Sequence, residues 1–321
     1  MKTRLNPYFS QLTWCFKLTS SNSEAKHAPF LDWMARTLTK DYQLVYLPDG
    51  LPVIKYPFDR CLKYNPVLIA AEGLAAHSSF YRDNSKQNKI IFKAASQWLL
   101  NNIKIRDTTQ DKFGVWLFEY PWSTHKGCLC IPPWTSSLAQ GLGISLLLRY
   151  AQDTGDVSAL RVASLAFKSF FYTVEEGGVI SLSEEGLPIF EEYGCIGRST
   201  PLNGWIFSIL GLYEYAKATD NPTAWSYFEL AIKSLTNHIK KYDQQIWLLH
   251  WSKYDNKTHP IASRRYHKTH VSQLEVLFSI TKRSEFARLH HKWQTGDRAL
   301  GPLIDVFQLL SIVLRFLKKS I

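Results

Sequence analysis

The sequence predicts a mainly α protein, namely an α/α toroid or incomplete (α/α) barrel with short β-hairpins, including one near the N-terminus. Three observations predict this class. Segments of helical length follow one another in pairs, a set of helix residues recurs 63 residues further along, and turn-forming residues separate short β-forming runs. At 321 residues and 45% hydrophobic composition, the chain can bury a full core.

The first expected element is a β-hairpin, because β-forming runs at 42–47 and 52–56 flank the turn Pro48-Asp49-Gly50. Helices are expected after it. Segments with helical length and largely amphipathic or apolar patterns are 66–78, 86–103, 136–152, 157–173, 201–218, 222–241, 268–281 and 303–317. We expect these helices to pair as hairpins.

An internal repeat supports the pairing. Gly141, Ser145 and Tyr150 recur at the same offsets as Gly204, Ser208 and Tyr213, and each set is followed by a loop that contains Thr and Asp. Repeated helix pairs that cannot bury their apolar faces alone are typical of stacked helical architectures. The alternative is coincidence between two helices rich in small residues.

Short strands are expected between the helices, at 115–118 and 179–182, with the second turning back into 187–193. Side chains alternate along a regular strand. Glu192 and Tyr193 would therefore point to opposite faces, and only a bend after Phe190 would bring both into one site.

Three parts of the chain are expected. The last of them is strongly apolar but too short to span a bilayer, and it carries Asp305, Gln308 and Arg315. A packed terminal helix is therefore favoured over a membrane-surface helix. The parts are an N-terminal segment with the hairpin (1–60), a toroid domain (61–300), and an apolar helix packed on or beside the toroid (301–321).

The charge balance predicts an anionic partner. Thirty-eight Lys and Arg residues against 27 Asp and Glu residues give a formal charge of +11, which attracts polyanions. The basic residues are scattered, with small clusters at Arg264-Arg265 and Lys318-Lys319, so no nucleic-acid-binding module is indicated. An aromatic content of 14% suits contacts with charged sugars as well as a core.

The cysteines indicate neither a disulfide framework nor a zinc site, because five is an odd number and no C-x-x-C pair occurs. A reducing compartment fits best. The N-terminus shows no apolar signal region. We therefore expect a cytoplasmic bacterial protein. Peripheral contact with the membrane through the C-terminal helix is the alternative.

Three motifs carry the chemistry: Phe190 to Tyr193, Trp251 to Asp255, and Tyr266 to Leu274. Each places a tyrosine beside ionisable or hydrogen-bonding residues next to a loop, where functional groups concentrate. A phenol becomes a competent base only if cations or hydrogen bonds favour its ionised form. Arg198 near Tyr193, Lys253 and Lys257 near Tyr254, and Arg264 and Arg265 before Tyr266 are the cations nearest in sequence.

Two other interpretations of these motifs remain open. His267 and His270 lie three residues apart on an expected helix, but no third ligand at zincin spacing follows, so a structural histidine pair is favoured over a metal site. Glu191 or Glu192, with Asp255 as the second carboxyl, could form the carboxylate pair of a glycosidase.

Together the motifs resemble the C-terminal catalytic domain of D-glucuronyl C5-epimerases, which convert glucuronate to iduronate within heparosan-type polymers. The resemblance runs from about residue 65 to residue 293. It is carried by Pro133-Trp134, Ser137 to Gly141, Glu191-Glu192-Tyr193, Leu202-Asn203-Gly204, Gly211-Leu212-Tyr213, Tyr254-Asp255, Tyr266-His267, Thr269-His270 and Gln273-Leu274.

The resemblance implies a catalytic α/α toroid that needs no cofactor and no metal. It implies that Glu192, Tyr193, Tyr254 and Tyr266 are catalytic, transferring a proton through an enolate or carbanion on opposite faces of the sugar. The substrate-binding residues expected with them are Trp134, Gln140, Arg198, Asn203, Lys257, Arg265, His267 and His270.

The chain departs from the family pattern at two points. Gly194 stands where the family has proline, and the segment between Tyr254 and Tyr266 is short, with Lys257 in place of an arginine. The expected function is C5 epimerisation of glucuronate in an acidic polysaccharide. A uronate polysaccharide lyase and an inactive acidic-glycan-binding protein are the alternatives, and a homodimer is compatible with the sequence.

Overall fold

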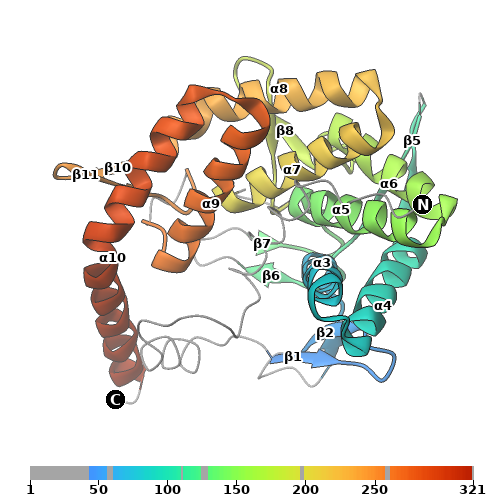
Figure 1. Ribbon diagram of the computed structural model, residues 1–321, viewed down its shortest axis with the longest axis horizontal. Coiled ribbons are helices and arrows are strands. Elements are labelled where there is room, and N and C mark those ends of the chain that lie inside the picture. The colour runs from blue at the N-terminus through green and yellow to red at the C-terminus, as the bar shows by residue number, and fades with distance from the viewer. Residues whose placement is uncertain are drawn as a thin grey trace.

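The computed structural model describes residues 43–55, 61–109, 111–123, 129–195, 199–256 and 261–319, without the side chains of Asp83 and of residues 307–319 (Figure 1). The predicted N-terminal hairpin is present as strands β1 (Gln43–Tyr46) and β2 (Pro52–Lys55), and β3 (Leu62–Lys63) extends the sheet. Gly50 closes the turn at a φ of +88°, a backbone conformation that favours glycine. The rest of the N-terminal part, residues 1–42 and 56–60, lies outside the described residues.

The described helices form four antiparallel pairs. In chain order they are α3 (Pro66–Asp83), α4 (Lys86–Asn102), α5 (Ser137–Thr154), α6 (Val157–Lys168), α7 (Leu202–Thr219), α8 (Pro222–His238), α9 (Arg264–Thr281) and α10 (Ser284–Lys319). Each odd-numbered helix packs on the next even-numbered one, and α3, α5, α7 and α9 also contact one another in succession. This arrangement is the predicted incomplete α/α toroid, and the fold class is confirmed.

Short antiparallel hairpins connect the helix pairs. They are β4 (Lys104–Asp107) with β5 (Lys112–Val115), β6 (Trp122–Ser123) with β7 (Leu129–Cys130), β8 (Ile180–Leu182) with β9 (Pro188–Phe190), and β10 (Asp243–Ile246) with β11 (Leu249–Ser252). The strands expected at 179–182 and 187–193 are β8 and β9. The strand expected at 115–118 is displaced, because β5 ends at Val115 and Phe118 instead forms a single bridge to Trp134.

The internal repeat belongs to α5 and α7, which are buried along most of their lengths. They approach so closely that a Cβ at Gly141 would lie 2.6 Å from the Ser208 Cα. Ser208 Oγ also donates a hydrogen bond to Ser137 Oγ across the contact, at 3.1 Å. The small residues of the repeat therefore permit the central helix contact of the toroid.

A buried ion pair crosses the same interface at its other end. Arg149 donates to both carboxylate oxygens of Glu214, each at 2.8 Å, and also to the Ser145 carbonyl at 2.7 Å. The Arg149 side chain is 3% exposed and that of Glu214 is fully buried. The two charges satisfy each other by bidentate hydrogen bonding, which is the geometry that a buried pair needs.

The C-terminal helix is longer than expected. The 303–317 segment is the second half of α10, which begins at Ser284 and has Pro302 in its interior. Arg264 explains why the helix continues past this point, because its guanidinium lies over Gly301 and pairs with Asp297 on one side and Asp305 on the other. Residues 301–319 thus continue α10 instead of starting a separate helix. No helix among the described residues has the length and apolar character that crossing a membrane requires.

Candidate active site

The loop after β9 supplies the first two residues of the site. The strand ends at Phe190, and the chain then bends through Glu192 and Tyr193. The bend is fixed at Glu191, whose carbonyl accepts a hydrogen bond from the Ser137 N–H at 2.9 Å. The bend that the sequence could not show is therefore present, and the Tyr193 hydroxyl donates a hydrogen bond to the Glu192 carboxylate.

The segment after β11 supplies the third residue, Tyr254. Its carbonyl accepts a hydrogen bond from the Leu202 N–H at 3.0 Å, and the next residue, Asp255, forms a β-bridge with Pro201. These contacts hold Tyr254 at the first turn of α7. Its hydroxyl is hydrogen-bonded to the hydroxyl of Tyr193, so Tyr193 stands between Tyr254 and Glu192 in this set of hydrogen bonds.

Helix α9 supplies the fourth residue, Tyr266, in its first turn. Ser263 caps the helix by accepting from the Tyr266 N–H at 3.4 Å, as serine commonly does at this position. The Tyr266 ring packs edge-on against Tyr254 with 4.8 Å between centroids and is 39% exposed. The four residues predicted to be catalytic, from three separate segments, therefore lie together.

Glu192 is the most perturbed acid of this cluster. It is 7% exposed, and burial raises its pKa to about 8, although the hydrogen bond from Tyr193 lowers it. At pH 7 only about one molecule in ten would carry the charge. Its Oε2 atom has no hydrogen-bond partner among the described residues and lies against Gly204, where any Cβ would overlap it.

The tyrosines of the cluster are held as neutral phenols. Burial, then the Glu192 carboxyl and Tyr266, raise the pKa values of Tyr193 and Tyr254 well above the usual value, although the hydrogen bond with Tyr254 lowers that of Tyr193. The sequence had led us to expect nearby cations that favour phenolates, and among the described residues this is wrong for these two tyrosines. At neutral pH both hydroxyls therefore keep their protons.

The cations that are near the tyrosines in the sequence do not all lie near them in the structure. Arg264 faces α10 and pairs with acids there, while Arg265 is exposed beside Tyr266. Arg198 and Lys257 lie outside the described residues. Among the described residues, Arg265 is thus an exposed cation that directly precedes Tyr266 in the chain.

The second glutamate, Glu191, faces away from this cluster. Ser181 Oγ donates to its Oε1 atom at 2.5 Å. Asp255 accepts from Ser199 Oγ at 2.9 Å, and both Asp255 and Glu191 help to raise the pKa of Tyr242 after the larger effect of burial. Two of the carboxylates considered for a glycosidase, Glu191 and Asp255, thus act on Tyr242.

Two of the predicted substrate contacts have structural roles instead. Gln140 is fully buried; its Oε1 accepts from the Trp116 N–H at 3.0 Å, and its Nε2 donates to the Gly114 carbonyl at 2.8 Å. Trp134 is 5% exposed, stacks on Phe118 at 3.8 Å and lies 6.2 Å from the Tyr193 ring. Neither side chain has a surface on which a sugar could stack or bind, although Trp134 supports Tyr193.

The predicted histidines are also buried. Nδ1 of His267 accepts from the Ser252 N–H at 3.0 Å, and its Nε2 bonds the Trp293 carbonyl at 3.0 Å. Burial lowers the pKa of His267 to about 4 and that of His270 to about 3. No cluster of metal ligands occurs among the described residues. The pair packs between β11, α9 and α10 as neutral imidazoles, and Nε2 of His270 has no hydrogen-bond partner among the described residues. This burial favours structural support over substrate contact for the two histidines.

Asn203 keeps its place beside the cluster. It lies in the first turn of α7, directly before Gly204, and is 9% exposed. Its carbonyl accepts from Gln273 Nε2 at 3.0 Å, whereas its side-chain Oδ1 has no partner among the described residues. An unsatisfied buried amide oxygen next to a functional carboxyl is available to a ligand hydroxyl.

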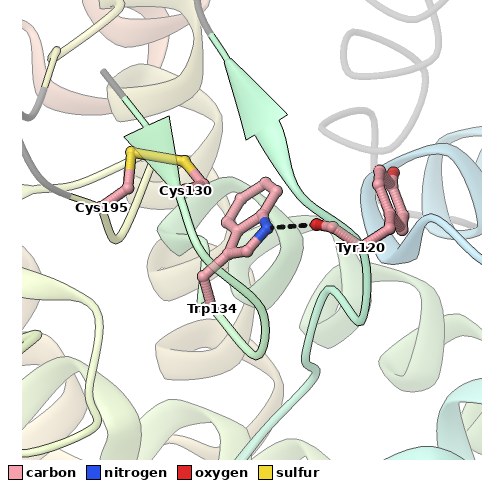
Figure 2. Close-up of a disulfide and its surroundings, with 4 residues drawn as sticks. All are labelled: Tyr120, Cys130, Trp134 and Cys195. Atoms are coloured by element: carbon pink, nitrogen blue, oxygen red, sulfur yellow. Dashed lines mark hydrogen bonds between the residues drawn. A yellow bond between two sulfur atoms is a disulfide. The ribbon is translucent and has the colours of Figure 1, made fainter. Parts of the chain in front are cut away.

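The structure also contains a disulfide bond, between Cys130 and Cys195 (Figure 2). The cysteine pattern did not indicate a disulfide framework, and the single bond present joins residues 65 apart in the sequence, so neither the odd number of cysteines nor their spacing pointed to this pair. The bond lies in an apolar cluster with Phe118, Tyr120 and Trp134, against which Tyr193 packs.

Two functional features escaped the sequence. Gly204 was visible only as a repeat residue, although its missing side chain provides the space for the Glu192 carboxyl. Cys195 follows Tyr193 by two residues, and that proximity was the available signal that the disulfide lies beside the tyrosine cluster.

Comparison with known proteins agrees with this geometry. A family model described as D-glucuronyl C5-epimerase C-terminus matches residues 110–295. A D-glucuronyl C5-epimerase of Caenorhabditis elegans is 28% identical over an alignment of 227 residues, and the match covers 65% of this chain and 35% of the length of that relative. The chain thus spans about a third of that relative.

Solved structures agree on the fold alone. A glycoside hydrolase family 76 α-mannanase of Bacteroides thetaiotaomicron superposes with a TM-score of 0.52 at 11% identity, covering 89% of this chain and 72% of the hydrolase. A second family 76 mannosidase of that organism gives 0.50 at 11% identity, covering 88% and 71% of the two chains.

Proposed function

Because this chain belongs to the D-glucuronyl C5-epimerase C-terminal family, we propose that it inverts C5 of glucuronate residues within an acidic, heparosan-like polysaccharide. The observation that carries the proposal is the buried chain of hydrogen bonds from Tyr254 through Tyr193 to Glu192. Inversion at a carbon beside a carboxylate needs one group that removes a proton and another that returns one, and this cluster supplies both.

Glu192 is the acid–base group on one face of the sugar. Its pKa of about 8 makes its ionised form a stronger base than an ordinary carboxylate, and it still ionises near neutral pH. In the forward step its carboxylate takes the C5 proton, and the C5 electron pair moves into the substrate carboxylate to give an enolate. The Tyr193 hydroxyl donates a hydrogen bond that stabilises the ionised carboxylate of Glu192 before it takes the proton.

A tyrosine returns a proton on the other face. Tyr266 is the most exposed of the three phenols and adjoins Tyr254, so its hydroxyl can reach a sugar lying over the cluster. Donation from oxygen to C5 closes the new C–H bond and leaves a phenolate, which the neighbouring phenols stabilise. Arg265 beside Tyr266 is the described cation proposed to hold the substrate carboxylate and the enolate charge.

Tyr266→Phe tests this assignment. The variant keeps the ring that packs on Tyr254 and loses only the proton donor, so we expect kcat to fall by about 10²- to 10⁴-fold with little change in melting temperature. Tyr64→Phe, at an exposed ring stacked on Trp98, is the matched control and should keep full activity. Full activity of Tyr266→Phe would remove this residue from the mechanism.

The polymer test separates the proposed reaction from its alternatives. Heparosan incubated with the protein is digested to disaccharides, which are analysed for iduronate and for the ultraviolet absorbance of unsaturated uronate. Iduronate without unsaturation supports the epimerase. Unsaturation would identify the lyase, which passes through the same enolate but expels the C4 substituent. Binding without either product would identify a glycan-binding protein.

Assembly and location are also proposals. Leu303 and Val306 on α10 are exposed, which supports contact of this helix with a membrane surface or with a second copy in a homodimer. Flotation with anionic vesicles and sedimentation velocity test the two. A cytoplasmic location is retained as a proposal, but disulfide bonds persist mainly in oxidising compartments; localisation of the tagged full chain decides it.

A further inference from the structure

The Tyr193 loop is fastened on one side to the segment that precedes α5. The Gly194 N–H donates to the Thr135 carbonyl at 3.0 Å, and the Cys195 N–H turns back to the Tyr193 carbonyl at 2.9 Å. Trp134 packs 6.2 Å from the Tyr193 ring. The Cys130–Cys195 bond completes this attachment covalently, two residues beyond Tyr193 (Figure 2).

Gly194 makes the close approach possible. A Cβ at this position would lie 2.7 Å from the Thr135 carbonyl oxygen and 2.8 Å from its Oγ1. A proline, which the family resemblance leads us to expect there, would also lack the N–H that Thr135 accepts. This chain therefore holds its Tyr193 loop by a hydrogen bond from Gly194 and by the sulfur bridge.

We propose that the Cys130–Cys195 disulfide is a positioning element of the proton-transfer site: it holds the Tyr193 hydroxyl against Glu192, and its reduction slows catalysis. The inference rests on the proposed function for its effect on rate. It also makes a structural statement about Tyr193 that can be measured without any substrate.

The chemistry of the step is thiol–disulfide exchange. A small dithiol such as dithiothreitol donates two electrons and two protons, the protein sulfur–sulfur bond breaks to give two thiols, and the reagent becomes a cyclic disulfide. Sulfur atoms bonded at about 2 Å must then separate to van der Waals contact, on the order of 1.5 Å further apart. Both half-cystines are buried, Cys130 fully and Cys195 at 8% exposure, so this separation displaces their neighbours.

The displacement of Cys195 is passed to Tyr193 through Gly194, the one residue that separates them in the chain. Misplacing a catalytic group by about 1 Å can cost on the order of 100-fold in rate. The titratable groups that act on Glu192 are the phenols of Tyr193 and Tyr254, and Tyr266 acts in turn on both of these tyrosines. Because the Tyr193 hydrogen bond lowers the pKa of Glu192, weakening that bond should raise this pKa further above 8.

The experiment compares the full chain in its oxidised state, after dithiothreitol treatment, and as Cys130→Ala/Cys195→Ala. Peptide mapping without reductant verifies the state of the bond. The Glu192 carboxyl is titrated by ¹³C NMR, assigned with Glu192→Gln, and kcat is measured on heparosan at several pH values. We expect the Glu192 titration and the matching limb of the pH profile to move to higher pH, and kcat to fall by about 10- to 100-fold. Reoxidation should restore both.

Cys61→Ser, at an exposed cysteine outside the bond, is the control and should match the oxidised protein. If the double variant does not fold, the reduced native chain decides. An unchanged Glu192 titration after reduction overturns the positioning role, whether or not the protein epimerises heparosan. An inactive oxidised protein refutes the proposed function alone, because the titration still tests the position of Tyr193. A lower kcat with an unchanged titration also overturns the inference, since it would reflect general loosening.

Discussion

Glu192→Gln is expected to reduce kcat by at least about 10³-fold and, at the same time, to stabilise the protein at alkaline pH. Glutamine keeps the size of the side chain and fills the space beside Gly204, but it cannot accept a proton from carbon. General acid–base groups contribute on the order of 10² to 10⁴ in rate, and Glu192 is the strongest base proposed for the site.

The stability change follows from the pKa of Glu192. Burial raises this pKa from 4.5 to about 8, so the unfolded chain ionises while the folded protein remains protonated. The contribution of protonated Glu192 to the free energy of unfolding is therefore fully present below pH 4.5 and is lost as pH rises through about 8. The variant avoids this loss, so its free energy of unfolding should exceed that of the wild type by on the order of 3 to 5 kcal/mol at pH 9 and by nothing at pH 4.5.

Urea unfolding of both proteins across this pH range measures the difference, and isotope-exchange assays measure the rate. Glu184→Gln, at an exposed glutamate in the β8–β9 turn, is the control for loss of a carboxyl and should change neither quantity. A variant that loses activity while its stability advantage stays constant with pH would contradict the raised pKa.

Arg149→Met is expected to cause the largest loss of stability, about 3 to 5 kcal/mol in the free energy of unfolding. The substitution keeps most of the apolar volume but leaves the fully buried Glu214 carboxylate without its bidentate partner. A buried charge without a partner is the costly outcome. Arg149→Met/Glu214→Leu removes both charges and should recover most of the loss.

Guanidinium chloride unfolding of the single and double variants measures these effects. The exposed pair of Arg283 and Glu229, 3.0 Å apart with side chains 37% and 59% exposed, provides the control, and Arg283→Met should cost less than about 1 kcal/mol. Equal costs at Arg149 and Arg283 would show that burial of the first pair has no energetic consequence.

Local patterns were sufficient for most of the fold. The Pro48-Asp49-Gly50 turn, the caps at Asn65, Ser85 and Ser136 and the apolar periods all act within a few residues. The continuous helix α10 could not be predicted in this way. Gly301 and Pro302 locally favour a break, and the tertiary ion pairs of Arg264 with Asp297 and Asp305 favour continuation.

In the site, too, features that depend on local sequence could be predicted, and features that depend on tertiary packing could not. The motifs around Glu192, Tyr193, Tyr254 and Tyr266 could be predicted as a group because each lies beside a loop. Burial could not be predicted, and it decided the rest. Gln140, His267 and His270 are buried polar residues that form hydrogen bonds with protein groups, although Nε2 of His270 has no partner among the described residues. The pKa of Glu192 likewise depends on its burial and on packing against Gly204, which lies in the first turn of α7, away from the loop of Glu192 in the sequence.

The disulfide shows that the number of cysteines alone does not predict whether a disulfide bond forms. An odd number of cysteines does not prevent one pair from meeting, and Cys130 and Cys195 are brought together by the β6–β7 hairpin and the loop after β9. Tyr193 lies between this bridge and Glu192, so the apolar cluster and the proton-transfer cluster share one residue.

The most direct test of the central claim is the exchange of the hydrogen at C5 of glucuronate with solvent. Heparosan is incubated in deuterated water with the wild type and with Glu192→Gln, and the C5 position is followed by NMR. The account predicts that the wild type incorporates deuterium at C5 together with iduronate signals, and that the variant does so at least about 10³-fold more slowly. Iduronate that retains the original C5 hydrogen, or equal exchange by the two proteins, would contradict proton transfer at Glu192.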